Sequence, residues 1–156
     1  MSPQPPLKQQ LQSDLTAAMK AQDELTRATL RMVLTAVKDA EVAGDAAREL
    51  SDDEVLGVVR REAKKRREAA EAFRSGGAVE RAERELAEGR VLQVYLPQQM
   101  GDHELAALVA EVVAETGAEG ARAMGAVMKA VGSRVAGRAE GGRVAAAVKQ
   151  ALAAAP

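Results

Sequence analysis

The sequence predicts an all-α protein, and three observations lead to that prediction. Hydrophobic residues make up 47% of the 156 residues, which is enough to form a buried core. There is one Phe, one Tyr and no Trp, so the core must come from Ala, Val, Leu and Met, which suit closely packed helices. Apolar residues recur at helical spacing, and no stretch shows the alternation of a strand. We expect an N-terminal helical subdomain of about four helices, followed by a small three-helix C-terminal subdomain.

The composition also limits the chemistry that the protein can perform and indicates its cellular location. The absence of Cys excludes disulfides, a thiol nucleophile and thiolate metal sites. No apolar segment approaches the ~20 residues needed to cross a bilayer, so we expect no membrane partner. The N-terminus lacks the features of a signal peptide, and the simplest expectation is a cytoplasmic protein. Three prolines in residues 1–6 predict a disordered tail there.

Two helices are expected directly after this tail. The first has one apolar stripe at a spacing of four residues: Leu7, Leu11, Leu15 and Met19. Asp23 can cap the second, and Gly44 is expected to end it. The expected inward face of this second helix consists of Leu25, Ala28, Met32, Ala36 and Ala40.

A third and a fourth helix complete the N-terminal subdomain, residues 7–96. Ser51 and Glu54 have the spacing of a capping box, so a helix should begin here and run to about Arg74. The fourth helix must end before Pro97, because the residue before a proline avoids the α region. Its expected inward residues are Val79, Ala82, Leu86 and Leu92.

The C-terminal subdomain is expected over residues 97–156. The fifth helix is closed by Gly117, and its apolar residues are Leu105, Leu108, Val109, Val112 and Val113. The sixth helix contains Met124, Val127, Met128 and Val131, and the last contains Val144, Val148 and Leu152. A glycine-rich turn over residues 137–142 separates these two helices.

Basic residues gather in this C-terminal subdomain. Residues 120–156 contain six Lys and Arg and one acid, although the whole chain has a net charge of −1. A glycine-rich turn that leads into a helix exposes backbone N–H groups, and arginines beside it can hold a phosphate. The alternative is a tight turn with arginines kept for solubility. The candidate nucleic-acid-binding residues are Lys129, Arg134, Gly137, Arg138, Gly141 and Arg143.

A second basic face is expected on the third helix. At about 100° per residue, five side chains spread over one broad face: Arg60, Arg61, Lys64, Lys65 and Arg67. This face either is solvated, with acidic partners such as Glu68, or binds nucleic acid. Arg66 instead lies on the apolar stripe, where an unpaired guanidinium would be costly. We expect Arg66 to form a structural ion pair with another helix or subdomain.

No catalytic site can be assembled from the sequence. The single histidine, His103, lies in a first helical turn with no second metal ligand or nucleophile beside it in the sequence. Phosphate-binding loops and nucleophile elbows are also missing from the sequence. We therefore expect no catalytic residue, no metal and no cofactor.

A resemblance to a known family rests on an ordered set of segments. These are Thr29-Leu30-Arg31-Met32, Glu62-Ala63-Lys64-Lys65-Arg66-Arg67-Glu68, Tyr95-Leu96-Pro97-Gln98-Gln99-Met100, Met124-Gly125-Ala126-Val127-Met128 and the Gly137–Gly141 turn. Through them the chain resembles the GatB/YqeY family, which includes YqeY-like proteins and the tail domain of the B subunit of glutamine-dependent aminoacyl-tRNA amidotransferases. Two departures concern helix caps. Glu140 replaces the usual Asp, so either the cap is weaker or Gly142 changes the helix start, and Gly101 replaces a common Ser, which removes another cap.

The resemblance implies a link to tRNA and a GatB-tail-like C-terminal subdomain. The first hypothesis is a non-catalytic accessory module that binds tRNA through phosphate and shape contacts. The alternative is an adaptor that docks an aminoacyl-tRNA synthetase or amidotransferase subunits. A carbon–nitrogen ligase activity with glutamine as amido donor is a family-level label, but no pair of nucleophile and base supports it here.

Overall fold

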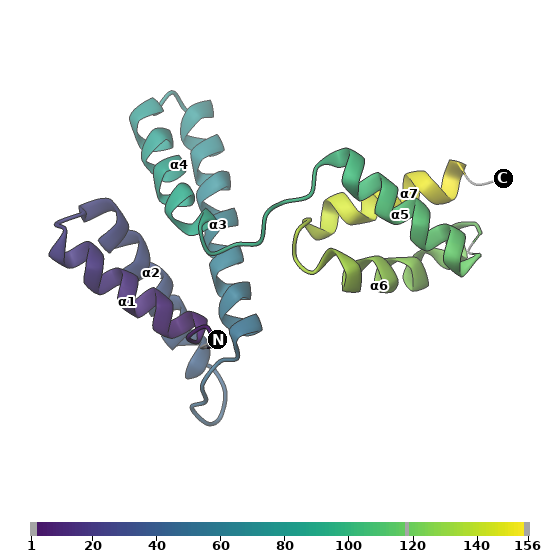
Figure 1. The fold of residues 1–156 in the computed structure, drawn as a ribbon. Helices are drawn as coiled ribbons and strands as arrows, with labels where there is room; N and C mark the ends of the chain where they lie inside the picture. The colour runs from purple at the N-terminus through teal and green to yellow at the C-terminus, as the bar shows by residue number, and fades with distance from the viewer. Residues whose placement is uncertain (1–2, 118, 155–156) are drawn as a thin grey trace. The chain divides into compact units, whose positions relative to one another are not determined.

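The computed structural model describes residues 3–117 and 119–154, and within them it is all-helical, as predicted. The elements are α1 (Leu7–Lys20), α2 (Glu24–Glu41), α3 (Asp52–Ser75), α4 (Val79–Gln93), α5 (Asp102–Thr116), the short 3-10 helix η1 (Ala121–Ala123), α6 (Met124–Val135) and α7 (Gly141–Ala154). The chain divides into two compact units, residues 1–96 (unit 1) and residues 97–156 (unit 2). Unit 1 contains α1 to α4, and unit 2 contains α5, η1, α6 and α7 (Figure 1). Within the described residues, no helix is both long and apolar enough to cross a membrane.

The expected disordered tail falls partly outside the described residues. Residues 1 and 2 are not described, and residues 3–6 contain no regular secondary structure. Helix α1 begins at Leu7, directly after Pro6, whose ring fixes an extended backbone at the helix entrance.

Unit 1 consists of two helical hairpins, α1 with α2 and α3 with α4 (Figure 1). Two capped starts define them. Asp23 accepts a hydrogen bond from the Thr26 backbone N–H at 3.1 Å. Ser51 and Glu54 form the predicted capping box. Leucine, valine and alanine side chains from all four helices then form one core: Leu11, Leu30, Val33, Val37, Val55, Val58, Val59, Ala63 and Leu92.

The fully buried face of α2 lies one to two positions from the predicted one, although the predicted residues Ala36 and Ala40 still pack against the core. Met32 is 53% exposed, whereas Leu30, Val33 and Val37 are fully buried. This helix carries apolar residues on more than half of its circumference, and the Leu and Val stripe provides the larger buried side chains. The core therefore selects that stripe. The helix also ends at Glu41, three residues before the predicted stop at Gly44.

The expected contribution of Val79 to the core is also incorrect. Val79 is the first residue of α4 and is 59% exposed, whereas Ala82 and Leu92 are buried. The beginning of α4 lies beside the end of α3, where the hairpin extends past the main core. Only small side chains such as Ala70 and Ala82 are buried there.

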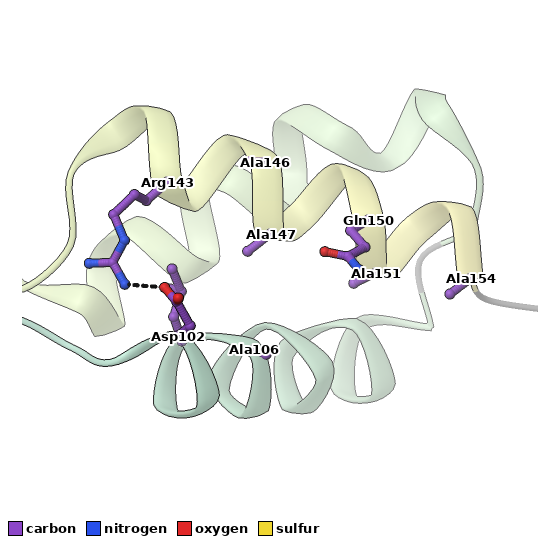
Figure 2. A pocket seen from close by; sticks show the side chains of 9 residues that line it. Asp102, Ala106, Arg143, Ala146, Ala147, Gln150, Ala151 and Ala154 are labelled. Carbon is purple, nitrogen blue, oxygen red and sulfur yellow. Dashed lines mark hydrogen bonds and ion pairs between the residues drawn. The ribbon is translucent and has the colours of Figure 1, made fainter.

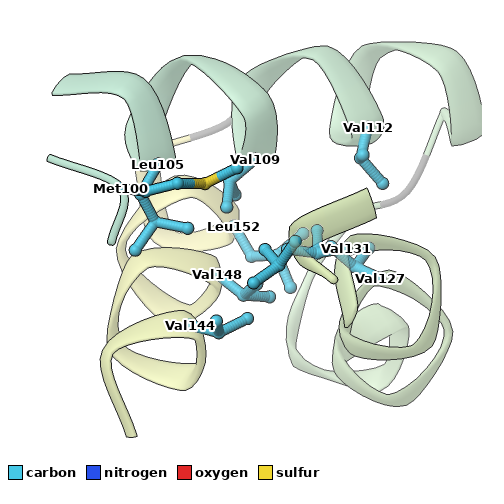
Figure 3. Close-up of a cluster of buried hydrophobic side chains, with 10 residues drawn as sticks. Met100, Leu105, Val109, Val112, Val127, Val131, Val144, Val148 and Leu152 are labelled. Atoms are coloured by element: carbon cyan, nitrogen blue, oxygen red, sulfur yellow. The ribbon is translucent and has the colours of Figure 1, made fainter. Parts of the chain in front are cut away.

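Unit 2 consists of α5, α6 and α7 around a core of valines, leucines and one methionine (Figure 3). Every predicted apolar stripe of these helices contributes buried residues, among them Val109, Val131 and Val148 at 0% exposure. Gly117 ends α5 in the left-handed conformation with φ 62°, as a helix C-cap glycine does.

The turn between α6 and α7 is shorter than the sequence predicts. Helix α7 already begins at Gly141, so the connection covers only residues 136–140. Ala136 and Gly137 reverse the chain with positive φ values of 49° and 80°. A positive φ is unfavourable for alanine but free of strain for glycine, which explains the glycine at position 137.

Candidate nucleic-acid interface

The α6–α7 turn brings together three of the predicted phosphate-binding arginines. Arg134 lies in the last turn of α6, Arg138 lies in the connection, and Arg143 lies in the first turn of α7. Their side chains are 34% to 42% exposed. Gly137 lies in the connection, Gly141 is the first residue of α7, and Lys129 is exposed on α6.

Each of these three arginines has acidic partners on α5. Arg134 forms ion pairs with Glu115 and, at 3.7 Å, with Glu111. Arg138 contacts Glu104 at 3.0 Å, and Arg143 contacts Asp102 at 2.8 Å. The hydrogen bond and ion pair with Glu115 raise the pKa of Arg134 above its usual value, which keeps this pair charged.

Arg138 and Arg143 also hold the segment that leads into α5. The Nε of Arg138 donates to the Gln98 carbonyl at 2.8 Å, and the Nη2 of Arg143 donates to the Met100 carbonyl at 2.9 Å. The Met100 backbone N–H in turn donates to the Arg138 carbonyl at 2.7 Å. These bonds satisfy carbonyl groups outside any helix, so both arginines have a structural task within unit 2.

Acidic residues of α5 balance the excess of basic residues in the C-terminal part of the sequence. Residues 97–119 contain five acids and no Lys or Arg, so unit 2 as a whole carries no formal net charge. Four of those acids face the arginines of the α6–α7 region: Asp102, Glu104, Glu111 and Glu115. An anion at this turn must compete with them.

A groove of about 500 Å³ lies between α5 and α7 beside this turn (Figure 2). Alanines such as Ala106, Ala147 and Ala151 line most of it, and the ion pair of Asp102 with Arg143 lies at one end. The polar groups at the groove are already paired or uncharged. Its lining therefore provides apolar contact and no catalytic chemistry.

The basic face of α3 differs from the turn in its partners. All five of its side chains are exposed: Arg60, Arg61, Lys64, Lys65 and Arg67. Lys65 pairs with Glu62 at 3.3 Å, and Lys64 lies 4.0 Å from Glu68. Arg60 and Arg61 form no ion pair with any residue that the structure describes. This face is therefore the less compensated of the two basic regions.

Arg66 lies behind this face, with its side chain only 4% exposed. It contacts the Glu62 carboxylate on its own helix at 2.8 Å and the Glu88 carboxylate on α4 at 3.4 Å. Its third neighbour is the Met32 sulfur on α2, 3.4 Å from Nη2. One buried guanidinium therefore connects three helices of unit 1.

The two glutamates around Arg66 were not predicted. Burial alone would raise the pKa of Glu62, but hydrogen bonds from Arg66 and Lys65 outweigh burial and hold the pKa below its usual value. The spacing of four residues between Glu62 and Arg66 was a usable signal in the sequence. No such signal existed for Glu88, because its pairing depends on the register of α4 against α3.

His103 is exposed in the first turn of α5. Within the described residues, no three His, Cys, Asp or Glu side chains gather to form a metal site. Tyr95 donates a hydrogen bond to Asp14, and burial and this bond raise the pKa of its hydroxyl well above its usual value. The tyrosine thus joins α1 to the segment after α4 as a neutral hydrogen-bond donor.

The protein is thus a helical protein of two units. Its charged side chains form an exposed basic face on α3 and ion pairs within each unit. The family model described as Yqey-like protein matches residues 8–152. The chain therefore belongs to the YqeY-like family, in agreement with the resemblance seen in the sequence. A comparison with curated proteins gives no match.

Proposed function

We propose that this protein is a non-catalytic accessory module of the tRNA aminoacylation and amidotransferase system that binds tRNA through phosphate and shape contacts. The family resemblance connects the chain to tRNA, and the α3 basic face is the observation that carries the proposal. Five exposed cations lie within eight residues there, and Arg60 and Arg61 have no acidic partner among the described residues. Phosphate contacts of this kind need no base recognition and no aromatic stacking.

The C-terminal arginines contribute to the same interface as secondary contacts. Arg134, Arg138 and Arg143 keep a third or more of their side chains exposed, and Lys129 is exposed with no described ion-pair partner. Exposed ion pairs contribute only about 0–1 kcal/mol, so a polyanion can compete for these guanidinium groups. The geometry nevertheless ranks α3 first, because Arg60 and Arg61 need no exchange of partners.

Filter binding with labelled tRNA tests the proposal. At about 50 mM and about 200 mM salt, the wild type should bind with an affinity that falls steeply as salt rises. An Arg60→Gln/Arg61→Gln variant should reduce the slope of log affinity against log salt by about two, and Lys129→Gln by about one. These three side chains are exposed, so circular dichroism should show an unchanged fold. Absence of salt-sensitive binding by the wild type would rule the proposal out.

A protein–protein adaptor is the second candidate, and an exposed apolar surface favours it. Met19 and Met32 are 48% and 53% exposed, and a sulfur–arginine contact of 3.9 Å joins Met19 to Arg31. Exposed methionines are typical of surfaces that adapt to several partners. An aminoacyl-tRNA synthetase or amidotransferase subunit that co-purifies after nuclease treatment, and is lost with Met19→Ser/Met32→Ser, would favour the adaptor.

A further inference from the structure

A groove of about 190 Å³ lies between α3 and α4 and continues the α3 basic face. Its polar lining consists of Arg67 from α3 and Glu85, Arg90 and Gln93 from α4. Ala63 and Leu86 form its apolar part. At ~30 Å³ per water molecule, the volume holds roughly six waters, which is enough for a phosphate group with part of its sugar.

Gly89 lines this groove and has no role in the fold that would require glycine. It is the eleventh of the fifteen residues of α4, in the helix interior, where glycine is unfavourable relative to alanine. Its φ is not positive, and a Cβ added there would meet no heavy atom within 4 Å. Neither backbone conformation nor packing within unit 1 therefore explains this residue.

The charges of the lining identify the kind of ligand. The lining contains two guanidinium groups, one amide and a single carboxylate, so it has a formal charge of +1. Arg90 is exposed and forms no ion pair with any described residue. Arginine matches the oxygens of a phosphate with two parallel hydrogen bonds. A glycine backbone lets such a group approach the helix closely.

We infer that the Gly89 groove, with Arg67, Arg90 and Gln93, binds one backbone phosphate of the RNA that lies along the α3 basic face. This inference rests on the proposed function and adds a defined contact to it. The α3 basic face provides the general attraction, whereas the groove fixes where one phosphate binds. Glu85 limits the groove to a single phosphate, because a second anion would face its carboxylate.

Two pairs of variants test the groove in the full-length protein with labelled tRNA. Gly89→Leu should fill the groove and weaken tRNA binding by about threefold or more, while the melting temperature stays equal or rises, because leucine favours the helix. Gly132→Ala is its control, since Gly132 in α6 also has no atom near its added Cβ. It should raise the melting temperature and leave the affinity unchanged.

Arg90→Gln is matched with Arg74→Gln, because both arginines are exposed and lie in the last turn of their helices. Only Arg90→Gln should reduce the salt slope by about one and the affinity by about threefold. Equal losses from both changes, or unchanged binding by Gly89→Leu, would overturn the groove while leaving tRNA binding intact. Failure of the wild type to bind tRNA would overturn the proposed function and the groove together.

Discussion

Unit 1 buries charged side chains in its interior, whereas the described residues of unit 2 keep theirs at the surface. Among the residues that the structure describes, all five buried polar or charged ones belong to unit 1: Thr29, Glu41, Glu62, Arg66 and Glu88. The core of unit 2 is entirely apolar, and Arg134, Arg138 and Arg143 pair with α5 acids that are about half or more exposed. A buried ion pair fixes the geometry of its neighbours at a high desolvation cost, and a surface pair does not carry that cost. The two units should therefore respond differently to the loss of a single charge.

One optical property allows the two units to be followed separately in the intact chain. Tyr95 is the single tyrosine, there is no Trp, and Phe73 is the single Phe. Both aromatic residues lie in unit 1. Tyrosine fluorescence therefore reports unit 1, while circular dichroism reports the helices of both units.

The largest expected effect is that of Arg66→Met. The change leaves the Glu62 and Glu88 carboxylates buried without their common partner, and breaking a buried pair in this way costs about 3–5 kcal/mol. Urea unfolding followed by Tyr95 fluorescence measures the loss. Arg74→Met removes an exposed arginine of the same helix and should cost less than about 0.5 kcal/mol. A loss below about 1 kcal/mol for Arg66→Met would show that the buried cluster does not hold unit 1 together.

The next effect concerns the apolar core of unit 2. Leu105 is 3% exposed, and Leu105→Ala should cost about 2–4 kcal/mol by removing buried methyl groups and leaving a cavity. Each unit has its own core, so the loss should appear in circular dichroism as an earlier transition. The midpoint of the tyrosine transition should stay in place. A joint shift of both signals would mean that the two units unfold as one.

The contrast between the cores also explains how far the fold could be predicted from the sequence. Each helix of unit 2 has one stripe of Val, Leu or Met side chains, such as Val144, Val148 and Leu152 in α7, and a single stripe leaves one choice of inward face. Helix α2 has two apolar stripes, one with Met32 and one with Leu30 and Val33. The arrangement of its neighbours decides which stripe is buried. That arrangement depends on tertiary packing, so it cannot be predicted from the periodicity of one helix.

The candidate site shows the same limit more strongly. The arginines around the α6–α7 turn could be found as basic residues beside glycines, but their acidic partners could not. Arg138 and Glu104 are 34 residues apart, and only the packing of α5 against α6 and α7 brings them together. The prediction of Arg66 as a buried residue needed only its place on an apolar stripe, so it required no tertiary information.

A smaller effect is the loss of stability of unit 1 under acid conditions. Four carboxyl groups of unit 1 have a lowered pKa: Asp23, Glu41, Glu54 and Glu62. Hydrogen bonds from Arg48 and Ser51 hold the pKa of Glu54 at about 2, against an ordinary value of 4.5. Because the folded pKa lies below the unfolded one, this stabilisation is complete above about pH 4.5 and is lost as the pH falls towards 2.

Urea midpoints from tyrosine fluorescence should therefore fall steadily between pH 4.5 and pH 2. Glu54→Gln should be less stable than the wild type at neutral pH, because Gln cannot form the ion pair with Arg48. The stability of Glu54→Gln should depend less on pH over this range, because unfolding should take up as much as about one proton fewer than in the wild type. An unchanged pH dependence in Glu54→Gln would mean that the other carboxyl groups account for the whole acid response.

The smallest effect comes from the helix caps, where the units again differ. Ser51 caps α3 with its side chain, whereas Gly101 occupies the same N-cap position of α5 without a side-chain hydrogen bond. Both residues have the extended backbone of an N-cap, and a Cβ at Gly101 would meet no atom within 4 Å.

Exchanging the residues at these two N-caps should therefore change the stability of the two units in opposite directions. Gly101→Ser should stabilise unit 2 by a few tenths of a kcal/mol, and Ser51→Gly should destabilise unit 1 by about as much, or more if Glu54 loses its place. Thermal unfolding by circular dichroism and tyrosine fluorescence measures both changes. Destabilisation by Gly101→Ser would show that the serine side chain does not cap α5 and instead disturbs the neighbouring ion pair of Asp102 with Arg143.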